Sequence, residues 1–465
     1  MQTPDILEDE LHGLLKLWLV RPMAKITKSG KKGFKARKLF PTYFAEGGSK
    51  CMITPKTMSL MKKLAVLFLM LVFAGCQETA VTPDNPPNLR TLSAAERQAS
   101  KSSNDFAFNL FRNLPTDPAD NSFISPLSVS MALGMLLNGA DDEVRQSILN
   151  TIDFKDFTAE EVNEGFHDLT DLLLSMDKKV NFGLANSVWY RQGLTVNTSF
   201  ASVIENYYDG KIMGLDFSNP TSKDVINTWV ESKTNNRIKD LIKEINPDHV
   251  MFLVNAIYFK GDWTHQFDKS KTKKAPFTTL SGATTQVDMM FSKGVSMKYK
   301  STPDFQLLDI PYGNGQFRFT VLMPNDYAGI TSMVETLNAE TFNTLLDASD
   351  SISVELELPK FKMNWRDDLK SSLGQMGMLM IGFPLLFEGP TPPIKVGQVI
   401  HQSFLEVNEE GSEAAAATAI GMEFTSVGPS IPMKITIDKP FLFMIREKHS
   451  GAILFLGQLT NPGAL

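Results

Sequence analysis

From about Ser93 onward, apolar and polar positions follow two different periods along the chain. Short runs that are apolar or alternate in polarity, bounded by glycine, proline and asparagine, predict β-strands. These strands cover residues 182–190, 250–259, 317–323, 352–358, 401–407, 433–437, 441–445 and 453–459. Between them lie longer stretches with helical periodicity, such as the amphipathic residues 222–233.

The clearest helix start is Ser125-Pro126, because proline is favoured in the first turn of a helix. The residues that follow, up to Leu137, are almost all apolar, so we expect this helix to be buried. Strands and helices do not alternate regularly as they do in a doubly wound fold. Runs of strands beside segregated helices predict an α+β fold.

The chain before this region has the pattern of an export signal. Met61-Lys62-Lys63 precede eleven uninterrupted apolar residues, 64–74, which are too few to span a bilayer as a helix. Phe73-Ala74-Gly75-Cys76 then resembles a bacterial lipobox, in which the cysteine is lipidated. We therefore expect an exported protein, either anchored to the cell envelope through a lipid on Cys76, at the outer membrane or cell surface, or extracellular.

These patterns divide the chain into four parts. Residues 1–60 are an upstream or non-mature segment, because Met58 or Met61 is a suitable translation start. Residues 61–75 form a signal peptide of the lipoprotein type, and residues 76–96 form a proline-containing linker. Residues 97–465 form one large globular domain.

The charge of the chain indicates which partners the domain can bind, and its cysteine content indicates whether disulfides stabilise it. The formal charge of -6 is unevenly distributed: the first 75 residues hold 13 Lys and Arg against 5 Asp and Glu, which leaves -14 for the remainder. An acidic domain argues against a nucleic-acid partner. Both cysteines, Cys51 and Cys76, precede the domain, so its fold owes nothing to disulfides.

The sequence contains no pattern typical of a catalytic or metal centre. It lacks the Gly-x-Ser-x-Gly elbow, the Cys-x-x-Cys pair and the His-Glu-x-x-His motif, and Gly313-Asn314-Gly315 lacks the third glycine of a dinucleotide loop. Histidines are few and scattered. We therefore expect neither an enzyme nor a bound metal or cofactor.

The segment that follows the strand ending at Val407 contradicts its surroundings. Asn408-Glu409-Glu410-Gly411 leads into Ser412-Glu413-Ala414-Ala415-Ala416-Ala417-Thr418-Ala419, which by propensity alone would be a short surface helix. The same residues resemble the hinge of the reactive-centre loop of inhibitory serpins. A second serpin signature follows in the right order, Ile435-Thr436-Ile437-Asp438-Lys439-Pro440-Phe441-Leu442-Phe443-Met444-Ile445.

The resemblance to the serpin family covers roughly residues 97–465 and is that of a bacterial inhibitory serpin. It implies three β-sheets with eight or nine helices, and an exposed reactive-centre loop above them. Residues 381–390 depart from the family pattern, because they are more apolar and richer in proline.

The same resemblance assigns three groups of residues. The hinge is Glu410, Gly411, Ser412, Glu413, Ala414, Ala415, Ala416, Ala417 and Thr418. The shutter, a polar cluster beneath the centre of the main sheet, is Ser125, Ser128, Asn255 and His401. The breach, where the loop first enters that sheet, is Trp263, Lys360 and Glu409.

The function implied is inhibition of a serine protease by a suicide mechanism, in which the cleaved loop of a metastable monomer inserts into the main sheet. Counting fourteen residues from Gly411 places the reactive bond between Thr425 and Ser426, with Phe424 and Met422 as alternates. These residues suit elastase-like or chymotrypsin-like enzymes, and a cysteine protease is a further candidate. The alternatives are a non-inhibitory serpin, acting as a carrier or chaperone, and a ligand-binding surface lipoprotein.

Overall fold

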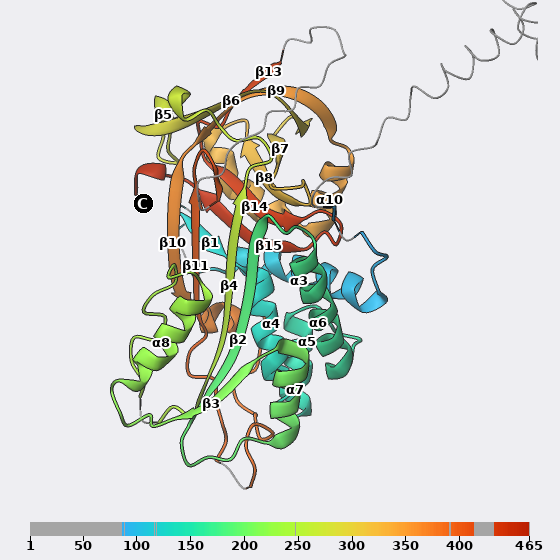
Figure 1. Cartoon of the computed structure of the whole chain (residues 1–465), viewed down its shortest axis with the longest axis vertical. Coiled ribbons are helices and arrows are strands. Elements are labelled where there is room, and N and C mark those ends of the chain that lie inside the picture. The colour runs from blue at the N-terminus through green and yellow to red at the C-terminus, as the bar shows by residue number, and fades with distance from the viewer. Residues whose placement is uncertain are drawn as a thin grey trace, which may run out of the picture. The chain divides into compact units, whose positions relative to one another are not determined.

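The computed structural model describes residues 86–87, 89–115, 117, 119–246, 248–389, 392–412 and 432–464. Six strands form an elongated sheet in the order β10-β11-β12-β4-β2-β3 (Figure 1). Neighbouring strands are antiparallel except for the parallel pair β2 and β3. The strands are β10 (Phe361–Asp368), β11 (Ile400–Val407), β12 (Gly411–Ser412), β4 (Met251–Asp262), β2 (Val180–Arg191) and β3 (Lys211–Leu215).

Nine further strands form a second sheet that bends into two parts. The bend lies in β6, where the register shifts between Lys293 and Val295 and Gly294 has a φ of 75°. One part holds β5, β9 and β13, and the other holds β7, β8, β14, β15 and β1. The bounds are β1 (Ser122–Ile124), β5 (Lys273–Thr278), β6 (Thr284–Ser301), β7 (Phe305–Pro311), β8 (Phe317–Pro324), β9 (Asp350–Pro359), β13 (Met433–Thr436), β14 (Phe441–Glu447) and β15 (Ile453–Leu459).

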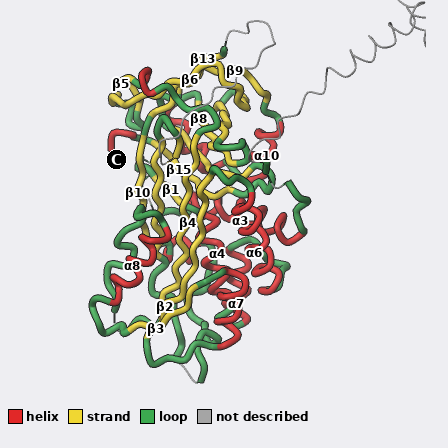
Figure 2. Tube along the Cα trace, in the orientation of Figure 1, coloured by secondary structure: helices red, strands yellow, loops and turns green. Residues whose placement is uncertain are grey.

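Nine α-helices occur in the described part of the chain, and α8 lies apart from the group α3 to α7 (Figure 2). Ser125 caps α4 as predicted: its side chain accepts a hydrogen bond from the Ser128 N–H, and Pro126 occupies the first turn. The helices are α3 (Ala94–Arg112), α4 (Pro126–Leu137), α5 (Asp142–Thr151), α6 (Ala159–Ser175), α7 (Thr198–Tyr208), α8 (Ser222–Lys233), α9 (Ile330–Thr336), α10 (Ala339–Asp347) and α11 (Lys370–Gln375), with short 3-10 turns at Lys269–Lys271, Tyr327–Gly329 and Pro462–Ala464.

The two faces of the six-stranded sheet are buried by different helices. On β4, Ile257 and Phe259 point into the larger core, which also holds buried side chains of α4 and of the nine-stranded sheet. Val254 and Ala256 point to the opposite face and pack in a smaller core under α8. A strand buried on both faces explains why residues 250–259 are apolar without alternation.

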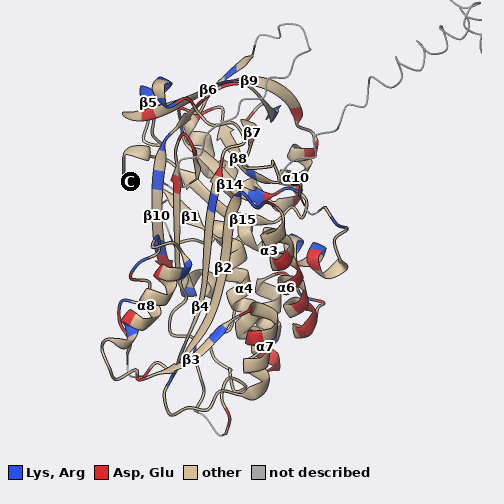
Figure 3. Ribbon diagram, in the orientation of Figure 1, with Lys and Arg blue, Asp and Glu red and all other residues tan. Residues whose placement is uncertain are grey.

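The fold class predicted from the sequence is confirmed: the arrangement is α+β. The six-stranded sheet and the two parts of the bent nine-stranded sheet correspond to the three predicted sheets. The buried helix at residues 126–137 is confirmed as well. Within the described residues, no helix is both long and apolar enough to cross a membrane. The acidic character of the domain is most visible on α6, which carries five Asp and Glu side chains and no Lys or Arg (Figure 3).

The apolar departure at residues 381–390 has a packing explanation. Phe383, Leu386 and Phe387 are buried in the larger core, and Leu386 lies so close to Gly139 that a side chain on Gly139 would collide with it. The connection between α11 and β11 therefore supplies core residues. Its described part contains only isolated bridges, such as the one between Ile381 and Lys395.

Candidate functional site

The first residues of the predicted hinge lie inside the six-stranded sheet. Gly411 and Ser412 form β12, in which Ser412 pairs with Val407 of β11 on one side and with Gly261 of β4 on the other. Among the described residues, β12 is the only strand that pairs with both β11 and β4, because β11 otherwise pairs with β10 and β4 otherwise pairs with β2. We call the facing edges of β11 (Ile400–Val407) and β4 (Met251–Asp262) the β11–β4 opening.

Both residues of β12 fit closely between their neighbours. A Cβ atom added to Gly411 would lie 2.1 Å from the Gly261 carbonyl oxygen, so only glycine allows this approach. The Ser412 side chain has no exposed surface, and its hydroxyl shares a hydrogen bond with the buried Tyr312 hydroxyl. Ser412 therefore points to the core face.

A tight turn delivers the chain from β11 into β12. The Asn408 side chain accepts hydrogen bonds from the N–H groups of Glu410, at 3.0 Å, and Gly411, at 3.3 Å. Trp263 holds the turn from the other side, because its indole N–H donates to the Asn408 carbonyl at 2.8 Å and its backbone N–H donates to the Glu410 carbonyl. The Trp263 ring stacks on Tyr312 with a centroid distance of 4.3 Å.

The breach residues Lys360 and Glu409 form an ion pair at 3.1 Å. Glu409 is only 8% exposed, and its other carboxylate oxygen accepts a hydrogen bond from the Thr272 hydroxyl at 2.9 Å. Burial of the Glu409 carboxyl favours its neutral form, but its hydrogen bonds outweigh burial and lower its pKa. The three predicted breach residues thus lie at one end of the β11–β4 opening, around the turn.

The four predicted shutter residues lie on two sides of the opening. On the β11 side, the His401 Nε2 accepts a hydrogen bond from the Ser125 N–H at 3.0 Å, which requires that nitrogen to be unprotonated. The ring is buried in the sheet, and burial lowers the pKa of His401 to about 4. The Ser125 hydroxyl donates to the Leu454 carbonyl at 2.8 Å.

On the β4 side, a chain of polar side chains runs away from the opening. The Ser128 hydroxyl donates to the side-chain oxygen Oδ1 of Asn255, and the Asn255 side-chain Nδ2 donates to Oδ1 of Asn186 on β2. Asn186 donates to the Tyr208 carbonyl at 2.7 Å, and the Tyr208 hydroxyl donates to Asn163 on α6 at 2.9 Å. His401 and Asn255 share no hydrogen bond, and the two groups of shutter residues meet at the start of α4, where the Ser128 N–H donates to the Ser125 side-chain oxygen at 3.3 Å.

The connection between α8 and β4 covers the opening on the face opposite the shutter. This connection is residues 234–250, of which 247 is not described. Leu241 and Ile242 pack with Val254 and Ala256 of β4, and Ile400 of β11 packs against the same cluster. Leu241 also accepts a hydrogen bond from Arg366 on β10 at 3.2 Å. The connection therefore contacts strands on both sides of the opening.

Several predicted site residues lie outside the described residues: the hinge residues Glu413, Ala414, Ala415, Ala416, Ala417 and Thr418, the reactive-bond candidates Met422, Phe424, Thr425 and Ser426, and Cys76. The structure adds residues to which the sequence assigned no role, namely Asn186, Tyr312 and Thr272, and it shows that Asn408 forms the turn before β12. Their signal was weak, because each is a single polar residue in an ordinary strand or loop. No group of three or more candidate metal-ligating side chains occurs within the described ranges.

Comparison with known proteins identifies the family. The family model for serpins, described as serine protease inhibitors, matches residues 101–462. The chain is a member of the serpin family. A serpin-like protein of Methanosarcina acetivorans is 31% identical over 433 residues, covering 86% of this chain and 99% of the relative.

Solved serpin structures agree with this assignment. The structure resembles human thyroxine-binding globulin with a TM-score of 0.72 and 28% identity, covering 79% of this chain and all of the other. It resembles tengpin, a thermophilic serpin in its native state, with a TM-score of 0.71 and 27% identity, covering 81% and 97% of the two chains. Serpins are mostly protease inhibitors rather than enzymes, but thyroxine-binding globulin shows that the family also has non-inhibitory members.

Proposed function

We propose that this serpin inhibits serine proteases as a suicide substrate. The observation that carries the proposal is β12: the first two residues of the loop segment already lie as a strand between β11 and β4. The remaining edges of the two strands extend alongside the path that the rest of the loop would follow. Adding a strand there would pair backbone groups on both edges, which is the driving force for insertion.

The register of β12 predicts where the inserted residues would lie. Six residues beyond Ser412, Thr418 would face His401 on β11 and Asn255 on β4, since Ser412 faces Val407 and Gly261. A hydroxyl at this place could bond both His401 and Asn255, which do not bond each other in the present state. Strand alternation would put Ala414 and Ala416 on the same core face as Ser412, where their small size avoids collision.

The chemistry follows from trapping a covalent intermediate. The protease serine attacks the carbonyl carbon of Thr425, and the Ser426 amine leaves, so the protease is held as an acyl ester on the loop. Insertion of the freed strand, at roughly 3.3 Å per residue, would carry the protease on the order of 50 Å along the sheet. Distortion of its active site would then slow hydrolysis of the ester, because even ~1 Å of misplacement is costly to catalysis.

The expected targets are elastase-like or chymotrypsin-like. Residues 413–432 contain no Lys or Arg, so a trypsin-like pocket would lack its charged partner. The test is to mix the protein with one protease of each type and look for a complex that survives detergent. Mass spectrometry of the released C-terminal peptide should find Ser426 as its first residue.

A non-inhibitory carrier is the second candidate, favoured by the structural similarity to thyroxine-binding globulin. Cleavage of the loop without a stable complex for any of the three proteases would support it and refute inhibition. Stable trapping of the trypsin-like enzyme alone would keep the mechanism but overturn the proposed reactive bond.

We propose further that a monomeric domain is displayed on the cell envelope through Cys76. The support is the apolar run at residues 64–74 and the Ala74-Gly75-Cys76 sequence. Fractionation should find the wild-type protein with membranes, and Cys76→Ala should release it or block its processing. Recovery of unprocessed wild-type protein from the cytoplasm would refute this part of the proposal.

A further inference from the structure

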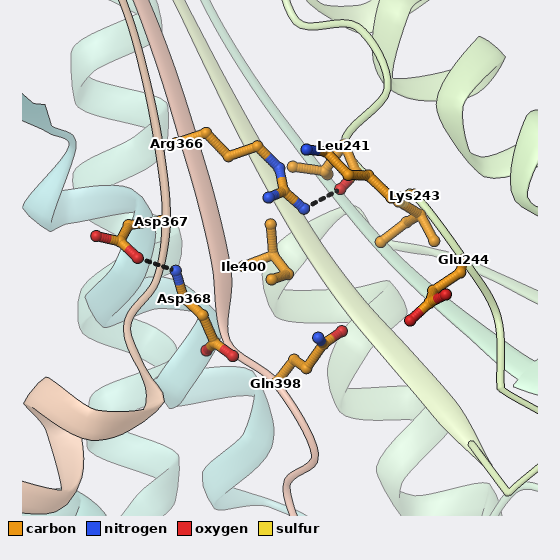
Figure 4. A pocket seen from close by; sticks show the side chains of 9 residues that line it. Leu241, Lys243, Glu244, Arg366, Asp367, Asp368, Gln398 and Ile400 are labelled. Carbon is orange, nitrogen blue, oxygen red and sulfur yellow. Dashed lines mark hydrogen bonds between the residues drawn. The ribbon is translucent and has the colours of Figure 1, made fainter.

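A pocket of about 480 Å³ lies at the end of the β11–β4 opening farthest from β12 (Figure 4). Its walls come from the connection after α8 and from the ends of β10 and β11. The lining residues are Leu241, Ile242, Lys243, Glu244, Arg366, Asp367, Asp368, Gln398 and Ile400. None of them belongs to the hinge, the shutter or the breach.

The pocket brings opposite charges together without pairing them. Arg366 and Lys243 supply two cations, and Asp368 and Glu244 supply two anions, while the Asp367 carboxyl points away from the other lining side chains. In the described part of the chain, none of these four side chains has an oppositely charged side-chain atom within 4.0 Å. A ligand with both signs of charge could therefore be bound without displacing an existing ion pair.

Arg366 is held in place, but not all of its N–H groups have a hydrogen-bond acceptor. Its Nη2 donates to the Leu241 carbonyl, whereas its Nε is buried and has no acceptor among the described residues. Gln402, the residue paired with Arg366 across β10 and β11, has a buried side-chain oxygen that likewise lacks a partner there. The inner end of the pocket thus has an unused donor, and an unused acceptor lies beside it.

The opposite wall is built around Asp368. One of its carboxylate oxygens accepts hydrogen bonds from the backbone N–H groups of Lys370, at 3.1 Å, and Val399, at 2.8 Å, which fixes the carboxylate beside Gln398. Leu241 and Ile242, both nearly buried, and Ile400 contribute apolar surface between the charged groups.

We propose that this pocket binds an amino acid or a short peptide in its zwitterionic form. The ligand carboxylate would bind the guanidinium of Arg366, which can offer two parallel N–H donors, with Lys243 nearby at the rim. The ligand ammonium group would lie toward Asp368 and Glu244. A pocket of this volume is at the small end of ligand sites, which suits a dipeptide.

Such a ligand would also affect the sheet. It would join the connection after α8, through Lys243 and Glu244, to β10, through Arg366 and Asp368, and β10 pairs with β11. Under the proposed inhibitory function, insertion between β11 and β4 must move these strands relative to the connection. We therefore expect bound peptide to slow loop insertion, a consequence that rests on the proposed function, whereas binding itself does not.

The experiment measures binding to the full chain in the absence of protease. Titration calorimetry with alanyl-leucine should give saturable binding, and both the C-terminal amide and the Arg366→Gln variant should weaken it at least about tenfold. The amide should lose no further affinity on the variant, because both changes remove the same interaction. N-acetylation of the dipeptide should weaken binding to wild type similarly.

Lys362→Gln is the matched control, since it removes a cation from the exposed face of β10 four residues from Arg366 but outside the pocket. It should leave affinity within about twofold of wild type. If Arg366→Gln does not fold, Lys243→Gln replaces it, because the Lys243 side chain is exposed and forms no hydrogen bond or ion pair with the described residues.

Three results would overturn the proposal. The first is the absence of saturable binding of alanyl-leucine or free leucine up to about 10 mM. The second is an equal loss of affinity in Lys362→Gln and Arg366→Gln. The third is a loss of affinity that is fully additive for amidation of the peptide and Arg366→Gln. A protein that binds the peptide but traps no protease would retain the pocket and lose only its effect on insertion.

Discussion

The two ends of the β11–β4 opening are built in different ways. At the breach, β12, the Asn408 turn and the Trp263 ring join the two sides through direct contacts, and the Lys360–Glu409 ion pair holds the turn from the β10 side. At the shutter, His401 and Asn255 each bond to their own side and not to each other. β12 is thus fixed where the loop enters the sheet. Farther along the opening, no hydrogen bond between His401 and Asn255 would have to break before a strand inserts.

Under the proposed inhibitory function, this arrangement would keep the native state stable although it is not the most stable state. Closing the breach costs little, because it uses two small residues and a preformed turn. Completing the sheet would require the whole loop to insert, although its C-terminal end is attached to β13. An intact loop cannot easily do this. Cleavage would remove that restraint.

Of the changes that test the difference between breach and shutter, cleavage of the loop should change the stability of the protein most. Cleavage between residues 419 and 429 should raise the melting temperature on the order of 20 °C, because each backbone hydrogen bond of a new central strand adds about 1 kcal/mol. Differential scanning calorimetry of intact and cut protein measures this directly. An unchanged melting temperature after a verified cut would mean that the shutter does not admit a strand.

The next largest effect should come from a charge in the hinge. Ser412→Arg would bury a cation against Tyr312 and should cost several kcal/mol in any state in which β12 stays in the sheet. The variant should be cleaved as a substrate and release active protease.

The control for that variant is Ala415→Arg, which strand alternation places on the opposite face of the inserted strand. It should inhibit with a stoichiometry closer to wild type, as counted by titrating residual protease activity. Equal loss in both variants would contradict the assignment of core-facing positions.

Acid should weaken the β11 side of the shutter. The pKa of His401 is lowered from about 6.5 to about 4 in the folded protein, so the unfolded chain binds the extra proton first. Stability should therefore be complete above pH ~6.5 and fall by about 3 kcal/mol as the pH is lowered to ~4.

Urea denaturation at a series of pH values gives the slope of the free energy of unfolding against pH. This slope should be lost in His401→Gln. Asp367 is the cross-strand neighbour of His401 and carries a carboxyl group, so Asp367→Asn is the matched control and should retain most of the slope. A slope that vanishes in Asp367→Asn instead would assign the effect to the carboxyl.

The smallest effect should come from the breach ion pair. Lys360 is 43% exposed, so Lys360→Met should cost less than about 1 kcal/mol in stability and less still in high salt. Its expected signature is kinetic: the turn should open more readily, and spontaneous loop insertion should be faster. Incubation at moderate temperature, followed by assay of remaining inhibitory activity, would reveal it, with Lys362→Met as the exposed control on β10.

The sequence by itself determined most of the fold. Alternating and apolar runs located the strands at 317–323 and 453–459, and Ser125-Pro126 located the start of α4, because these signals are local and need no partner. The two serpin signatures determined the family, since they are specific and lie in the right order. Residues 381–390 looked irregular, and their local chemistry gave no sign that Phe383 and Leu386 fill the larger core.

Tertiary structure decided the state of the site. Propensity favours a helix for the segment that begins at Ser412, but Ser412 is in a strand, because the edges of β11 and β4 offer backbone partners that propensity does not count. Sequence also could not show that His401 bonds to Ser125 rather than to Asn255, since both bonds satisfy the same buried nitrogen. Which one forms depends on the distance between two strands, and that distance is set by the packing of the whole sheet.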